Sequence, residues 1–278
     1  MSRGHLAAMA ALLLALAGCG GPSAAPEPAA SSAAAPPDPK AALLASVAAL
    51  DELNYEFTHG SPYHGDLSGV VHAPTGVLEL QHRVKYSDTD IYDVRYRRVG
   101  EAHWLRIDLS QYAGLTGEPP AALTGKVWLP ARAVSTRDEF GPLVFARPEQ
   151  GLTGVERLVT GVVTVTRKGV ATFEGTLDVT GAEPGTLGFG LEAEHVKALG
   201  ERARSLTFRA TTDNRGRLRQ FGIELPAAGD YGSGGMTFTF DQYGTARAPA
   251  APTGDDLGTG DDLKAAVEGL RALQDRPA

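Results

Sequence analysis

Four histidines near the start of the folded region are the residues whose type and spacing most suggest metal chemistry. They are His59, His64, His72 and His82, and imidazole is a common zinc ligand. If the chain turns at Pro74-Thr75, His72 and His82 fall on opposite faces or lie about four residues apart along their strands. The second arrangement separates them by roughly 13 Å, too far to share one ion. We therefore expect surface or hydrogen-bonded histidines and no metal.

Motifs for other chemistry are missing from the sequence. It contains no His-Glu-x-x-His, no Gly-x-Ser-x-Gly and no phosphate-binding loop, and its one Gly-x-Gly-x-x-Ala, at 188–193, follows no buried strand. The Thr-Gly-Asp-Asp-Leu repeated at 253 and 259 lacks the alternating oxygen ligands and closing Glu of a calcium loop. We expect no catalytic residue, no cofactor and no enzymatic activity.

Cys19 is the residue with the clearest predicted chemistry. A basic start at Arg3 and an apolar run over 6–17 precede Leu16-Ala17-Gly18-Cys19, which is the layout of an export signal. The tetrapeptide resembles the lipobox of bacterial lipoproteins, whose cysteine is acylated before cleavage. Cys19 is the only cysteine, and a lone thiol in an oxidising compartment is a liability unless it is consumed. The alternative is an ordinary secretory signal with a chance cysteine.

Residues 19–38 are rich in Ala, Pro and Ser and are expected to be a disordered tether with a reach of about 25 Å. With residues 1–18 as the signal peptide, acylated Cys19 would anchor the protein at the extracytoplasmic face of the cell membrane, because two or more acyl chains hold a protein stably. The net charge of −7 argues against nucleic acid as a partner.

The folded region begins with helical spacing over 41–53 and then changes to alternation of apolar and polar residues. Such alternation indicates antiparallel strands with one solvated face. It recurs at 67–73, 77–86, 92–97, 103–108, 171–180, 206–211, 221–225 and 236–241.

Three further helices are expected, over 155–160, over 192–203 and after a cap at Asp261-Asp262. The last has Leu263, Val267, Leu270 and Leu273 on its apolar face. We assign residues 39–245 to the main domain and 246–278 to a linker and this C-terminal helix.

About eight or nine strands with few helices predict an α+β, mostly antiparallel protein. A single sheet this wide curls because strands twist, so we expect one strongly curved sheet, a half-barrel, with a few short helices on its concave side. Helices that fill the concave face would give an ordinary core, and helices that cover it in part would leave an apolar cavity.

A resemblance to a known family rests on three segments. They are Trp104-Leu-Arg-Ile-Asp108-Leu109, Asp213-Asn-Arg-Gly216-Arg-Leu218 with Phe221-Gly-Ile223, and Thr237-Phe-Thr-Phe240-Asp-Gln-Tyr243-Gly244. With the lipobox, their order resembles actinobacterial lipoproteins of the LppX, LprG and LprA type, whose half-barrel is similar to that of LolA and LolB. The resemblance implies a hydrophobic cavity that binds acylated lipids or lipoglycans and carries them across the envelope.

A lipid cargo is physically reasonable, because each methylene removed from water contributes about 0.8 kcal/mol. Arg217 and Arg219 share the parity of Phe221 and are candidate headgroup contacts, with ordinary surface arginines as the alternative. An envelope protein with a filled core that binds a protein partner is the second functional class. The candidate contacts with a lipid tail are Leu78, Leu80, Tyr92, Tyr96, Leu105, Phe173, Phe208, Phe221, Phe238 and Phe240.

Overall fold

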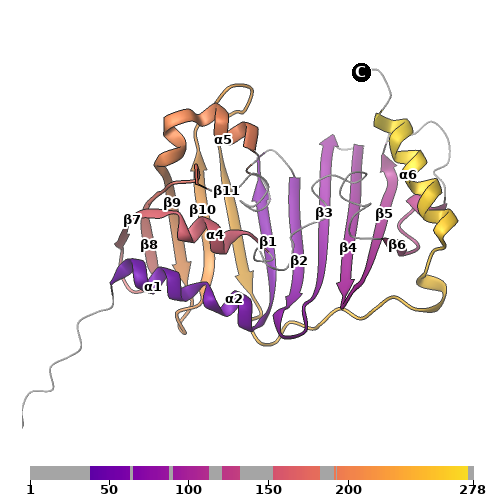
Figure 1. Ribbon diagram of the computed structural model, residues 1–278, viewed down its shortest axis with the longest axis horizontal. Coiled ribbons are helices and arrows are strands. Elements are labelled where there is room, and N and C mark those ends of the chain that lie inside the picture. Colours follow the sequence, from indigo (N-terminus) through magenta and orange to yellow (C-terminus); the bar gives the residue numbers. More distant parts are fainter. Residues whose placement is uncertain are drawn as a thin grey trace, which may run out of the picture. The chain divides into compact units, whose positions relative to one another are not determined.

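A computed structural model shows the chain built around one open antiparallel sheet (Figure 1). The structure describes residues 38–62, 65–87, 90–112, 121–131, 153–181, 191 and 193–274, and gives the backbone alone for 65, 84–87, 90, 131 and 269–274. The α+β class with a single antiparallel sheet is therefore confirmed.

The sheet has eleven strands in the described part of the chain, in the order β6-β5-β4-β3-β2-β1-β11-β10-β9-β8-β7. The sequence predicted eight of them and missed β1, β6 and β7. The strands are β1 (Asn54–Ser61), β2 (Gly65–His72), β3 (Val77–Ser87), β4 (Asp90–Val99), β5 (Ala102–Tyr112), β6 (Leu129–Ala131), β7 (Val162–Arg167), β8 (Thr172–Leu177), β9 (Leu206–Thr212), β10 (Leu218–Leu225) and β11 (Gly234–Asp241).

The centre of the sheet is the junction between its first and last strands. β1 pairs with β11 so that Phe57 lies opposite Phe240 and His59 lies opposite Phe238. Every other pairing joins strands that are consecutive in the sequence. Two meanders, β1 to β6 and β7 to β11, thus meet at one long-range ladder.

Short helices accompany the sheet, and those predicted from the sequence are all present. α1 begins where the Asp38 carboxylate accepts a hydrogen bond from the Ala41 amide at 3.0 Å, with Pro39 in the first turn. The α-helices are α1 (Pro39–Ser46), α2 (Ala48–Glu52), α4 (Val155–Thr160), α5 (Ala193–Leu199) and α6 (Gly260–Gln274), and the 3₁₀ turns are η1 (Ala73–Thr75), η2 (Ala121–Leu123), η5 (Gly200–Arg204) and η6 (Gly254–Asp256).

The apolar residues of the strands form one core with the helices. α1, α2 and α4 lie in front of β7 to β11 and β1 (Figure 1), and their buried Leu43, Leu50 and Leu158 belong to the same hydrophobic cluster as Phe208. At the other end of the sheet, α6 packs against β6 and η2. The helices therefore cover the two ends of the apolar face.

Residues 246–259, predicted to be a linker, follow the ends of the strands from β11 to α6 (Figure 1). The Arg97 guanidinium donates to the Ala250 carbonyl at 2.8 Å. The Trp128 amide donates to the Asp256 carbonyl at 2.7 Å, and the Gly258 amide donates to the Trp128 carbonyl at 2.9 Å. These bonds hold the segment against the sheet.

The C-terminal helix α6 begins with a capping box rather than with a cap on Asp261-Asp262 alone. The Thr259 hydroxyl accepts from the Asp262 amide at 3.2 Å, and the Asp262 carboxylate accepts from the Thr259 amide at 2.7 Å. Leu263 and Val267 pack on the core as predicted. The side chains of Leu270 and Leu273 lie outside the described residues.

Candidate functional site

The ten predicted tail contacts lie on one continuous apolar face of the sheet. Nine of them are at most 3% exposed, and Tyr92 is partly buried against the same cluster. An empty cavity wide enough for an acyl chain would expose the side chains that line it to water. These nine residues therefore line no empty space of that width in this conformation.

Five of the ten are phenylalanines beneath the helices. Phe208 and Phe221 stack with their ring centroids 5.4 Å apart, and Phe238 and Phe240 stack at 6.4 Å. Phe173 belongs to the same cluster as Leu43 of α1 and Leu158 of α4. This part of the face is an ordinary packed core, in which aromatic pairs add stability beyond their buried area.

The other residues lie on β3, β4 and β5, between the β1–β11 centre of the sheet and its β6 edge. Leu80, Tyr96 and Leu105 stand opposite one another on these adjacent strands, and Leu78 lies one step along β3. None of the described helices lies over β2, β3 or β4 in Figure 1. We call Leu78, Leu80, Tyr96 and Leu105 the mid-sheet patch, because the described α-helices lie to either side of it (Figure 1), although η2 contacts β5, the strand of Leu105.

One polar group is built into the mid-sheet patch. The Tyr96 hydroxyl is hydrogen-bonded to His103 Nδ1. Burial raises the pKa of Tyr96 to about 12, although Arg98 opposes the shift. Burial, and then Arg98, lower the pKa of His103, so the imidazole is neutral near neutral pH. The patch therefore carries no charge on these two side chains.

The two predicted headgroup contacts do not converge. Arg217 forms an ion pair with Asp213 at 2.6 Å, and its guanidinium lies 4.6 Å from the centroid of the Tyr243 ring. Burial favours a higher pKa for Asp213, but hydrogen bonds from Arg217 and Arg215 lower it below its usual value. Arg219 is exposed.

The parity expected for these arginines is wrong because of a β-bulge in β10. The pairing with β9 shifts between Leu218 and Gln220. Leu218 and Phe221 are both buried, three positions apart, while Arg219 between them is exposed. One extra residue in a strand exchanges the two faces beyond it.

His72 and His82 lie on opposite faces of the β2–β3 hairpin, which is one of the two arrangements expected from the sequence. His72 pairs with Val77, and His82 pairs with Leu67, which lies five residues before His72 on β2. Because side chains alternate along a strand, the two rings lie on opposite faces of the hairpin. His72 Nδ1 is hydrogen-bonded to Thr75 at 2.7 Å. Within the described ranges no group of three or more His, Cys, Asp or Glu could hold a metal ion. His64 lies outside the described residues.

Cys19, the signal peptide and nearly all of the tether also lie outside the described residues. Among the residues that the structure does describe, no helix is both long and apolar enough to cross a bilayer.

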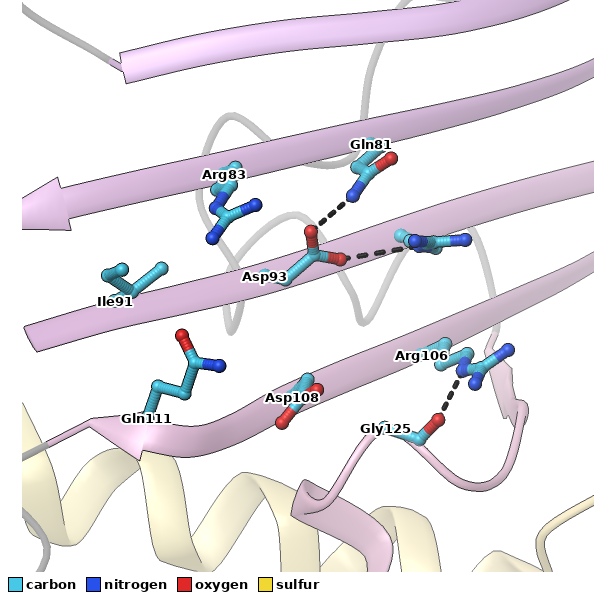
Figure 2. Close-up of a pocket in the computed structure, with 9 residues that line it drawn as sticks. Gln81, Arg83, Ile91, Asp93, Arg106, Asp108, Gln111 and Gly125 are labelled. Atoms are coloured by element: carbon cyan, nitrogen blue, oxygen red, sulfur yellow. Dashed lines mark hydrogen bonds and ion pairs between the residues drawn. The ribbon is translucent and has the colours of Figure 1, made fainter.

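The polar face of β3, β4 and β5 carries a hollow that sequence reasoning did not single out (Figure 2). Its volume is about 210 Å³. Alternation predicts the polar face for six of its residues, on β3, β4 and β5, but which of them are neighbours depends on strand register. The lining residues are Gln81, Arg83, Ile91, Asp93, Arg95, Arg106, Asp108, Gln111 and Gly125.

A second unpredicted feature is an acidic group inside the fold. The Oε1 atom of Glu156, on α4, is buried, as is the Tyr55 hydroxyl, and neither atom has a hydrogen-bond partner in the described part of the chain. Burial raises the pKa of Glu156 to about 7, and Asp51 adds to the shift, whereas Thr153 and Arg157 oppose it. Glu156 therefore titrates near neutrality.

Comparisons with protein-family models, with curated proteins and with solved structures gave no match. The mid-sheet patch and the polar hollow are thus defined by the positions and contacts of the chain's own residues.

Proposed function

We propose that this chain is an envelope lipoprotein, anchored by acylated Cys19 at the extracytoplasmic face of the membrane, that binds the acyl chain of a lipid or lipoglycan on the apolar face of its sheet. In this proposal the open sheet is a half-barrel of the LppX, LprG and LprA type with its helices on the concave side. The tether of residues 19–38 lets the domain reach lipids away from its own anchor.

The observation that carries the proposal is the mid-sheet patch. Leu78, Leu80, Tyr96 and Leu105 form an apolar surface on adjacent strands, and the described helices lie to either side of it (Figure 1). The four side chains are at most 3% exposed, so a lipid reaches this surface only if the protein opens over it. Once exposed, an apolar surface of this kind is a typical ligand or partner site.

The energetics of acyl binding suit such a surface. Each methylene group moved out of water contributes about 0.8 kcal/mol, so a chain of a dozen carbons needs no polar contact to bind tightly. The four patch residues are at most 3% exposed in this structure. The protein must therefore open over the patch before a lipid can bind. The free energy of this opening lowers the measured affinity below the value expected from burial of the acyl chain alone.

The same burial favours a second candidate function. If the patch stays closed, the protein has a filled core and acts by binding an envelope protein through its surface. The nine nearly unexposed tail contacts are the observation in favour of this alternative.

A lipid extraction separates the two functions. The full chain carrying Cys19→Ser, which removes the acylation site, is purified without detergent, extracted with organic solvent and analysed by mass spectrometry. One bound amphiphile per protein supports lipid binding. An empty extract, together with no binding of the fluorescent fatty acid cis-parinaric acid, refutes lipid binding and supports the partner-binding function.

Two matched variants locate the lipid. Leu80→Ala and Leu177→Ala each remove a buried leucine from the sheet, at 3% and 0% exposure, and each should cost about 2–5 kcal/mol of stability. Leu80 belongs to the mid-sheet patch, whereas Leu177 lies on β8 at the helix-covered end. Only Leu80→Ala should weaken parinaric acid binding. An equal effect of both variants would place the lipid elsewhere.

A further inference from the structure

We infer that the hollow on the polar face of β3, β4 and β5 binds an uncharged, hydroxyl-rich ligand, a single sugar ring. The hollow lies on the face of the sheet opposite the mid-sheet patch, so this inference does not depend on the proposed lipid binding. It rests on the strand register, on how the lining side chains are held, and on their charges.

The register places like charges directly opposite one another. Arg95 on β4 faces Arg106 on β5, and Asp93 faces Asp108 one step further along the same two strands. Directly opposed like charges destabilise a sheet. Here, like charges face each other across the two strands, and opposite charges are neighbours along each strand. The repulsion within each like-charged pair is offset by attraction along the strand, as in the Arg95–Asp93 ion pair at 3.3 Å.

The charged groups at the base of the hollow are held in place before any ligand arrives. Asp93 accepts hydrogen bonds from Gln81 and Arg95 (Figure 2). Asp108 accepts from the amide and hydroxyl of Ser110, at 2.9 and 2.6 Å. Groups fixed by their neighbours lose little conformational entropy when a ligand binds.

A tight turn forms one wall. The Arg106 guanidinium donates to the Gly125 carbonyl (Figure 2), and Gly125 has a φ of +69° with its Cα set against Asp108. A Cβ at this position would lie 2.9 Å from the Asp108 side chain, so only glycine fits. The turn orients Arg106 and closes one side of the hollow.

Hydrogen-bonding groups remain available at the mouth. Arg83 and Gln111 are exposed there, and neither has a side-chain hydrogen bond to another residue in the described part of the chain. Asp93 and Asp108 each keep spare acceptor capacity, because a carboxylate accepts about four hydrogen bonds. A ligand in the hollow thus meets donors and acceptors side by side.

The charges select the class of ligand. Three arginines and two aspartates line the hollow, so an anion is attracted by the former and repelled by the latter, and a cation meets the reverse. The described residues offer no cluster suited to a metal ion. A hydroxyl group both donates and accepts, and therefore satisfies arginine and aspartate in turn. The volume of about 210 Å³ is below the roughly 300–1,000 Å³ of drug-sized pockets, which limits the ligand to one ring.

The test is saturation-transfer NMR on the full chain carrying Cys19→Ser, with glucose, galactose, mannose, arabinose and N-acetylglucosamine as separate probes. Inorganic phosphate and magnesium chloride are titrated in parallel. The variants are Arg83→Ala and Gln111→Ala, whose exposed side chains do not support the fold, and the isosteric Asp93→Asn. The control is Arg209→Ala, which removes a 70% exposed arginine from another strand.

At least one sugar should bind saturably at millimolar concentration, with affinity about tenfold lower in Arg83→Ala and Asp93→Asn and unchanged in Arg209→Ala. No binding of any of the five sugars overturns the inference, as does binding of phosphate or magnesium in their place. An equal loss in Arg209→Ala would also overturn it. Unchanged parinaric acid binding in Asp93→Asn keeps this result distinct from that of the lipid proposal.

Discussion

The Arg97 guanidinium lies over the Trp128 ring, with its central carbon 4.1 Å from the ring centroid. The same group forms an ion pair with Glu79 at 2.5 Å and donates to the Ala250 carbonyl. Arg97 therefore connects β3, β4, the edge of the sheet near β6 and the segment that leads to α6. A planar guanidinium can make all these contacts at once, which an ammonium cannot.

Arg97→Ala should lower the free energy of unfolding by about 2 kcal/mol, because it leaves the partly buried Glu79 carboxylate unpaired and exposes the Trp128 ring. Urea unfolding followed by Trp fluorescence measures this. Arg209→Ala, whose ion pair with Glu174 spans 3.8 Å at the surface, should change stability by less than about 0.5 kcal/mol. Similar effects of the two substitutions would contradict the role of Arg97.

Glu156 should make the protein less stable as the pH rises towards neutrality. Burial raises its pKa in the folded state from 4.5 to about 7, so the folded protein binds a proton that the unfolded chain has already lost. The stability linked to that proton is complete below about pH 4.5 and is lost as the pH rises through about 7.

Glu156→Gln mimics the protonated acid and should remove this pH dependence. Above about pH 7 the variant should be more stable than the parent by on the order of 3 kcal/mol. Urea unfolding across the pH range measures it, with the exposed Glu224→Gln as the control. If the parent and Glu156→Gln respond identically to pH, Glu156 is not the titrating group.

The repeated Thr-Gly-Asp-Asp-Leu provides an internal control for helix capping. Thr259 caps α6 through its side chain, whereas Thr253, at the same position of the first copy, makes no side-chain cap to η6. Thr259→Ala should therefore destabilise α6 by about 1 kcal/mol, and Thr253→Ala should have little effect. Hydrogen exchange of the α6 amides distinguishes them, and faster exchange in both variants would count against the capping box.

Gly175 should be irreplaceable in β8. A Cβ added there would overlap the Thr164 carbonyl oxygen of β7 and lie 3.0 Å from the Phe208 ring. Gly175→Ala should cost at least about 2 kcal/mol, as expected for overpacking in a closely packed sheet. Gly60→Ala in β1, where nothing lies within 4 Å of the added atom, should be tolerated. Thermal unfolding of the two variants, which undergo the same chemical change, tests the difference.

Local periodicity predicted most of the elements, because apolar and polar residues alternate along each half-buried strand. This alternation can be recognised within the strand's own sequence. The face of the sheet to which each side chain points was predicted less reliably. In β10 the alternation assigned Arg219 to the side of Phe221, and the bulge beside Leu218 reversed that assignment. A bulge depends on the pairing with β9, and the period of one strand contains no information about its partner.

The candidate sites show the same limit. Alternation placed Asp93 and Asp108 on the polar face. That the two residues lie directly opposite each other depends on how β4 and β5 are aligned. Gly125, which closes the hollow, lies between the predicted strand at 103–108 and the predicted helix at 155–160, where the sequence has no apolar–polar period. The mid-sheet residues Leu80 and Tyr96 were predicted as apolar and inward, whereas the placement of the helices at the two ends of the sheet required the three-dimensional structure.

The pairing of β1 with β11 has a consequence for how the protein is made. The strand that pairs with β1 at the centre of the sheet is β11, the last strand to be synthesised, so β1 gains this partner only when nearly the whole chain has been made. Until then, the open edge of β1 can pair with a strand of another chain. Chains interrupted before residue 241 should therefore be prone to aggregate, and the cell would need to keep the growing polypeptide apart from its copies until the final strand arrives.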